Sequence, residues 1–140
     1  MDRVAQQIAD RLDPAACLRG LRDHADDHFM PPGLRAAAPL TDLLVRGADM
    51  LLPTGRSVSI DPKASGVALH FLSAGPREGC VTKRQVADLQ FVATDLDSSF
   101  GEGPFEVRGS SMALITAMTG RDALASQLAG AGVATLLGGD

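Results

Sequence analysis

The chain has 140 residues, of which 45% are hydrophobic and 21% are charged, and its formal net charge is −4. This length and composition predict one ordinary globular domain or two very small ones. Aromatic residues make up only 4%, and Trp and Tyr are absent, so a core must be built mainly from Leu, Ala, Val and Met. The 13 basic residues are scattered among 17 acidic ones, which argues against nucleic-acid binding, because such surfaces gather Lys and Arg.

Cellular location and redox state are constrained by two further features. No run of about 18 apolar residues exists, which argues against a membrane partner, and the opening Met-Asp-Arg-Val lacks an apolar signal region. We therefore expect a cytoplasmic protein. Cys17 and Cys80 are too few and too far apart for a disulfide framework and are expected to be reduced thiols.

Apolar residues at helical spacing predict three helices in the first fifty-odd residues, over 2–12, 14–29 and 39–51. Asp13 and Pro14 suit the N-cap and first position of the second helix, which should end at the prolines after Met30. The residues expected to face inward are Val4, Ile8 and Leu12 in the first helix, Leu18, Leu21, Ala25 and Phe29 in the second, and Leu40, Leu43, Leu44 and Leu51 in the third.

The remainder of the chain mixes helical and strand patterns. Asp61-Pro62 opens a predicted helix over 61–73, and alternating residues predict a strand over 89–94. The further elements expected are a hairpin turn over 98–104, a return strand over 105–108, a helix over 111–119 capped by Gly109-Ser110-Ser111 and closed by Gly120, a short helix from Asp122 to Leu128, and a last short strand over 133–136. The glycine pairs Gly101/Gly103 and Gly130/Gly132 are interpreted as turns.

These elements predict an α+β protein: a helical segment over 1–55, then a small α+β domain over 56–140 with a short antiparallel sheet. Three helices alone make a thin core, since a four-helix bundle needs one more element. Either the C-terminal half or another chain must cover their apolar stripes. We therefore expect a homodimer, or a partner chain that supplies the missing helices.

Two stretches carry a resemblance. They are LRDHADDHFMPPGLRAAAPLTDLLVRGADMLLPTGRSV and FVATDLDSSFGEGPFEVRGSSMALITAMTGRDALASQLAGAGVATL. Both resemble the mycothiol-dependent maleylpyruvate isomerase family. PLTDLLV and VRGSSMALITAMTGR are their most specific parts. The resemblance implies part of a DinB-like helical bundle, followed by a sterol-carrier-like domain. It also implies mycothiol as cofactor, and a divalent metal such as zinc held by an early-helix His and an acidic-x-x-x-His pair.

The residues that match this metal site are incomplete. The acidic position falls on Asp42, but the histidine position falls on Arg46, which has no lone pair for a metal. The early-helix histidine has no counterpart, because the chain is expected to begin after that helix. The substrate-binding arginine of the family falls on Arg121. We expect Asp42 and Arg46 to form an i, i+4 ion pair; alternatively, Arg46 and Arg121 clamp an anionic ligand.

A weaker alternative metal site lies in the second helix. His24 and His28 have the i, i+4 spacing of a zinc-binding pair, with His70 or a distant carboxylate as third ligand. Two ordinary surface histidines explain the spacing more simply.

Three hypotheses for function follow. In the first, the protein lacks the family's metal, needs no cofactor, and binds a small anionic or apolar molecule near Arg121, with Asp42 and Arg46 as further contacts. In the second, it is a mycothiol-dependent isomerase or thiol transferase, with Arg121 as a catalytic residue, completed by a second chain or dimer partner. In the third, it is a purely structural remnant. The first is our leading prediction.

Overall fold

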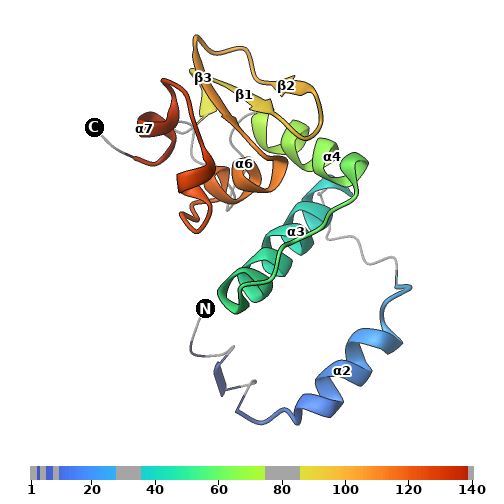
Figure 1. Cartoon of the computed structure of the whole chain (residues 1–140). Helices are drawn as coiled ribbons and strands as arrows, with labels where there is room; N and C mark the ends of the chain where they lie inside the picture. Colours follow the sequence, from blue (N-terminus) through green and yellow to red (C-terminus); the bar gives the residue numbers. More distant parts are fainter. Residues whose placement is uncertain (1–2, 4–5, 8–9, 28–35, 75–85, 139–140) are drawn as a thin grey trace. The chain divides into compact units, whose positions relative to one another are not determined.

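The computed structural model describes the chain except residues 1–2, 4–5, 8–9, 28–35, 75–85 and 139–140 (Figure 1). It contains two compact units, Met1–Met30 and Pro31–Asp140. Helices accompany a three-stranded sheet, so the predicted α+β class is confirmed. The division between the units lies before helix α3 (Ala37–Leu51), whereas we had predicted a boundary near residue 55.

The first unit contains helix α2 (Pro14–Asp23), which begins as predicted. The Asp13 carboxylate accepts a hydrogen bond from the Ala16 backbone N–H at 3.2 Å, and Pro14 occupies the first helical position. The helix ends at Asp23 rather than at residue 29, and it has no buried residue. Leu18 and Leu21, predicted to face inward, are 54% and 72% exposed, and Leu12 is also exposed. A helix this short gains little stability by itself, and none of the residues of α2 is buried. Val4, Ile8 and Phe29 lie outside the described residues.

In the second unit, α3 turns one face to the core and leaves another exposed. Thr41, Val45 and Ala48 are buried, but Leu43 is 68% exposed, so the prediction that Leu43 faces inward was wrong. The buried face includes Thr41 because its hydroxyl donates to the Ala37 carbonyl at 2.7 Å and needs no water. A pattern based on large apolar residues missed this threonine and placed the inner face too far round the helix.

Helices α4 (Pro62–Ser73) and α6 (Ser111–Met118) form the centre of this unit. The Asp61 carboxylate caps α4 by accepting from the backbone N–H groups of Lys63 and Ala64, at 2.8 and 3.3 Å. All residues of α6 are buried. Ser110 caps this helix through its hydroxyl, as predicted. None of the helices in the described part of the chain is both long enough and apolar enough to cross a lipid bilayer.

The sheet is mixed, with strand order β2-β1-β3. Strand β1 (Leu89–Ala93) was predicted, and its residues alternate between buried and half-buried. It pairs with β2 (Ser98–Phe100) in an antiparallel arrangement and with β3 (Phe105–Gly109) in a parallel one. The predicted antiparallel pairing of 89–94 with 105–108 was therefore wrong. Strand β2 takes the hairpin position, and β3 lies on the opposite edge of β1 (Figure 1).

The connection from β2 to β3 passes tightly across the beginning of β1. The Gly103 N–H donates to the Leu89 carbonyl at 3.3 Å, and the Phe105 N–H donates to the Asp88 carbonyl at 3.2 Å. A Cβ atom on Gly103 would lie 2.0 Å from the carbonyl carbon of Asp88, closer than atoms can approach. Gly101 and Gly103 therefore belong to a close backbone crossing rather than to a simple hairpin turn.

The C-terminal segment covers the outer edge of β3. Arg108 and Ala129 exchange backbone hydrogen bonds of 2.7 and 2.9 Å, and the Gly132 N–H donates to the Glu106 carbonyl at 2.9 Å. The predicted last strand over 133–136 is instead helix α7 (Val133–Leu136), because four apolar or small residues do not distinguish strand from helix by period. Short 3₁₀ helices occur at Leu52–Thr54 and Ala125–Gln127, the latter inside the helix predicted from Asp122. The core joins α3, α4, β1, β3, α6 and α7 through Val45, Leu69, Phe71, Leu72, Leu89, Phe91, Val107, Leu114, Ile115, Met118 and Leu136.

Two glycine variants should separate a backbone clash from backbone strain. Gly103→Ala is expected to destabilise the protein by more than about 3 kcal/mol, because its Cβ would overlap the backbone of Asp88 and Leu89. Gly120→Ala should cost only about 1 kcal/mol, since Gly120 has φ +79° but open space around its Cβ position. Urea unfolding of the purified variants measures both. Equal losses would contradict the close crossing.

Candidate functional site

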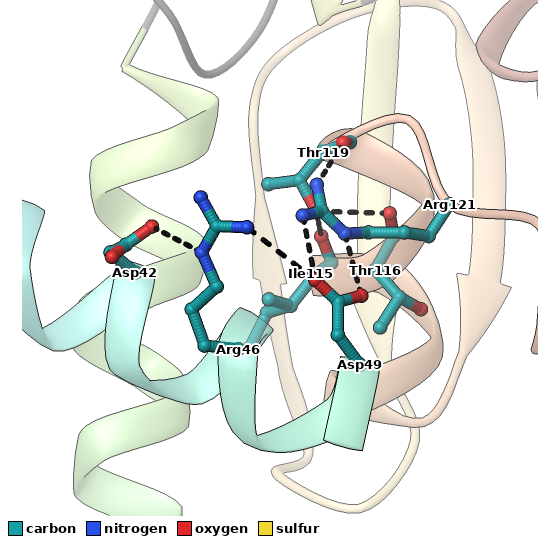
Figure 2. A network of polar contacts seen from close by, with 7 residues as sticks. All are labelled: Asp42, Arg46, Asp49, Ile115, Thr116, Thr119 and Arg121. Atoms are coloured by element: carbon teal, nitrogen blue, oxygen red, sulfur yellow. Dashed lines mark hydrogen bonds and ion pairs between the residues drawn. The ribbon is translucent and has the colours of Figure 1, made fainter. Parts of the chain in front are cut away.

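Three charged residues singled out from the sequence, Asp42, Arg46 and Arg121, lie together with a fourth, Asp49, on one side of α3 and after α6 (Figure 2). Asp42, Arg46 and Asp49 occupy positions i, i+4 and i+7 of α3 and so share one helix face. Arg121 follows Gly120, whose left-handed backbone ends α6 with φ +79°. The sequence elements that position the cluster are thus one regular helix and one helix terminus.

The strongest contact in the cluster joins Arg121 to Asp49. The Arg121 Nε donates to one carboxylate oxygen at 3.0 Å, and a terminal nitrogen donates to the other at 2.9 Å. The second terminal nitrogen donates to the Thr119 carbonyl at 2.6 Å. About one third of each charged side chain remains exposed, 31% for Arg121 and 37% for Asp49. This bidentate pair ties α3 to the C-terminal end of α6.

The end of α6 is itself held by threonine hydroxyls. The Thr119 hydroxyl donates to the carbonyls of Ile115 and Thr116 at 2.8 and 3.0 Å (Figure 2). The Arg121 backbone N–H also donates to the Thr116 carbonyl, at 2.9 Å. The carbonyls of Ile115 and Thr116 are therefore satisfied, and the Arg121 charge lies at the negative end of the helix dipole, where a cation is favoured.

Arg46 makes weaker, more exposed contacts. Its Nε lies 3.4 Å from Asp42, and a terminal nitrogen lies 4.0 Å from Asp49. The predicted Asp42–Arg46 ion pair is present, but both side chains are about two-thirds exposed, 64% for Arg46 and 68% for Asp42. Such a pair contributes little to stability in water. Arg46 and Arg121, which we had considered as a clamp on an anion, both lie against the carboxylate of Asp49.

Asp49 is the residue that the sequence reasoning missed. Its pKa is lowered chiefly by the hydrogen bond from Arg121, and further by the charges of Arg121 and Arg46, while partial burial acts in the opposite direction. The i+3 spacing from Arg46 was a usable signal. The prediction did not include Asp49, because only Asp42 matches the acidic position that the family resemblance implies.

The alternative metal pair is described only in part. The Nδ1 of His24 lies 2.7 Å from an Asp27 carboxylate oxygen, and both side chains are exposed. His28 lies outside the described residues, and His70 belongs to the other compact unit. Among the residues that the structure describes, no group of three or more His, Cys, Asp and Glu side chains could hold a metal ion. Cys17 is a free, half-buried thiol, and Cys80 is not among the described residues.

A hollow of about 570 Å³ lies elsewhere in the second unit, against α4. Its volume is within the range of about 300–1,000 Å³ that small-molecule sites occupy. Arg121, near which we expected a ligand, is not among the described residues around it. Those residues are Ala37, Lys63, Gly66, Val67, His70, Phe71 and Ala74.

Comparison with known proteins adds no assignment. No family model, curated protein or solved structure matches this chain. The maleylpyruvate isomerase resemblance therefore stays a prediction, and the geometry of the described residues must support any functional proposal.

The partly exposed Asp49–Arg121 pair should stabilise the fold in a pH-dependent way. Asp49→Asn is expected to lower the free energy of unfolding by about 0.5–1 kcal/mol at pH 7, because the bidentate pair is lost. The pKa of Asp49 is lowered in the folded protein, so wild type should lose this contribution as the pH falls below about 4 and the carboxyl binds a proton. The gap between wild type and variant, measured by urea unfolding, should then close.

Asp42→Asn is the matched control, because Asp42 lies on the same helix face but pairs with Arg46 in a more exposed position. It should cost at most a few tenths of a kcal/mol at any pH. If Asp42→Asn and Asp49→Asn destabilise the protein equally at pH 7, the special role of the Arg121 pair is refuted.

Proposed function

We propose that this chain is a maleylpyruvate isomerase-like, cytoplasmic protein that binds a small molecule and does not use the metal on which that family depends. The observation that carries the proposal is the Arg46 side chain, ion-paired to Asp42 at the i, i+4 position where the resemblance calls for a ligand histidine. A guanidinium stays protonated and cannot coordinate a cation. The donor set on this face of α3 therefore does not fit a divalent metal.

The arginines supply instead the charge compensation that a metal would supply. Asp42 is balanced by Arg46, and Asp49 is balanced by Arg121 and Arg46. A face whose charges are matched internally can hold α3 against the end of α6. It offers no thiolate-activating centre, because that chemistry needs a cation with open coordination positions. We therefore assign this cluster a structural role, and place ligand binding elsewhere in the unit.

Metal analysis tests the proposal directly. Protein purified without a histidine tag should contain well below one equivalent of zinc or another divalent ion, measured by mass spectrometry, and zinc should not raise its melting temperature. One tightly bound ion per chain would overturn the proposal. It would favour metal-assisted thiol chemistry, with mycothiol as cofactor and a second chain completing the site.

A variant makes the same test sharper. Arg46→His would restore an Asp-x-x-x-His pair, with Asp49 on the same helix face, and should create zinc binding that is micromolar or weaker and visible by calorimetry. Arg46→Gln removes the same positive charge without adding a ligand and should bind no zinc. Equal zinc binding by Arg46→Gln and Arg46→His would show that position 46 is irrelevant to metal binding.

The proposal includes self-association. Leu43 and Met50 are each 68% exposed on α3 and are separated by two helical turns, with Gly47 between them. A contiguous exposed apolar patch marks a contact surface, and a homodimer or a partner helix would cover Leu43 and Met50 together. These residues support the expected oligomer more directly than the inward stripe we predicted for α3.

Sedimentation velocity tests this part of the proposal. The wild-type chain should sediment as a dimer at micromolar concentrations, and Leu43→Glu should shift it toward monomer by placing a charge in the contact. Arg56→Glu, in the exposed loop after Gly55, is the control and should leave the dimer intact. A wild-type monomer at all concentrations would contradict self-association and would leave a partner chain as the remaining prediction.

A further inference from the structure

The outer face of α4 is unlike the outer face of an ordinary surface helix. Five residues at helical spacing form this face, and each is exposed or half-buried: Lys63, Gly66, Val67, His70 and Ala74. The opposite face of α4 is buried in the core. Together with Ala37 and Phe71, this outer face lines the partly open hollow of about 570 Å³.

We propose that this hollow is the binding site for a small, mostly apolar molecule that carries one acidic group. The acid would pair with the Lys63 ammonium, and the apolar body would lie against Gly66, Val67 and Phe71. The inference rests on the proposed function, since it names the site and ligand class of a protein proposed there to bind a small molecule.

The charge of the hollow favours an anion. Lys63 and His70 are the charged or polar side chains among the described residues that surround it, and no acidic residue is among them. The nearest carboxylate in sequence, Asp61, already accepts two backbone N–H groups at the start of α4. In a chain of net charge −4, this is a local cationic position beside apolar surface. His70 adds a ring N–H that can donate to an acceptor on the ligand.

The shape of the hollow favours a molecule of moderate length. From Lys63 to Ala74 the helix rises about 16 Å, which suits a fused-ring acid or a medium-length acyl acid. Gly66 lies halfway along, and a Cβ atom there would meet nothing within 4 Å. Packing therefore does not require glycine, although glycine weakens a helix interior. Its effect here is to widen the floor of the hollow.

Two dyes that differ in one charge test the proposal. The probes are 1-anilinonaphthalene-8-sulfonate, an apolar anion, and N-phenyl-1-naphthylamine, the same rings without the sulfonate. Fluorescence titration should give tighter binding of the anion. Lys63→Gln should weaken anion binding by about threefold to tenfold and change neutral-dye binding by less than about twofold, because only the anion loses a charge partner. Arg56→Gln, outside the hollow, should change neither.

A second pair of variants tests the location. Gly66→Leu should abolish binding of both dyes by filling the hollow, while the fold is retained, since the new side chain enters open space. Gly20→Leu places the same side chain in open space on α2, away from the described residues that line the hollow in sequence and in unit, and should leave dye binding unchanged. Far-UV circular dichroism and unfolding curves confirm that each variant is folded.

The outcomes decide between the site and its rivals. Equal effects of Lys63→Gln and Arg56→Gln, or dye binding that survives Gly66→Leu, would overturn the proposal. Dye binding that disappears as the protein is concentrated would place a second copy in the hollow and would also overturn it. Metal analysis of the same preparation reports separately on the proposed function, so the two can fail independently.

Discussion

The need to enclose α6 governs the second unit. Every residue of this helix is buried, and it is apolar around its whole circumference, which is typical of a core helix. Helices α3 and α4 and strands β1 and β3 all contact it. The buried Thr116 hydroxyl finds its hydrogen-bond acceptors within the helix, where it donates to the carbonyls of Met112 and Ala113 at 2.8 and 3.0 Å. A helix of this kind cannot form without its covers, so α3 belongs with the C-terminal elements.

This enclosure also determines which surfaces are left for function. Helices α3 and α4 each give one face to the core and keep another outside. The outer face of α3 divides into the charged row of Asp42, Arg46 and Asp49 and the apolar pair of Leu43 and Met50. The outer face of α4 borders the hollow. These surfaces are positioned by helices whose inner faces are close-packed, and such elements hold side chains more firmly than loops do.

The sequence was informative wherever a short-range signal determines the structure. Three helix starts were predicted from Asp13-Pro14, Asp61-Pro62 and Gly109-Ser110-Ser111, because helix capping depends on neighbouring residues. It failed where the outcome depends on distant contacts. Residues 105–108 would show the same pattern in a parallel and in an antiparallel strand. The strand is parallel because the chain first crosses the start of β1, and this crossing requires Gly103 because a side chain there would overlap the backbone of Asp88.

The same distinction applies to the candidate sites. The i, i+4 ion pair of α3 could be predicted, whereas the partner of Arg121 required the fold that brings residues 49 and 121 together. The hollow could not be predicted either. Lys63 and His70 are separated by two turns, which is ordinary spacing for surface residues. Among the described residues around the hollow, Ala37 comes from α3, and its position depends on the fold.

The two sites differ in what an incoming anion must displace. At Arg121, a ligand carboxylate would have to replace both hydrogen bonds from the guanidinium to Asp49. This exchange of one carboxylate for another would add little binding free energy. Asp49 belongs to the same unit as Arg121 and therefore competes with the ligand at a high effective concentration. At Lys63, none of the described residues presents a carboxylate to the ammonium across the hollow. An anion there adds a charge partner without breaking an ion pair made by the described residues. The residue that best matched a substrate-binding arginine is thus the weaker candidate, and a lysine that matched no motif is the stronger one.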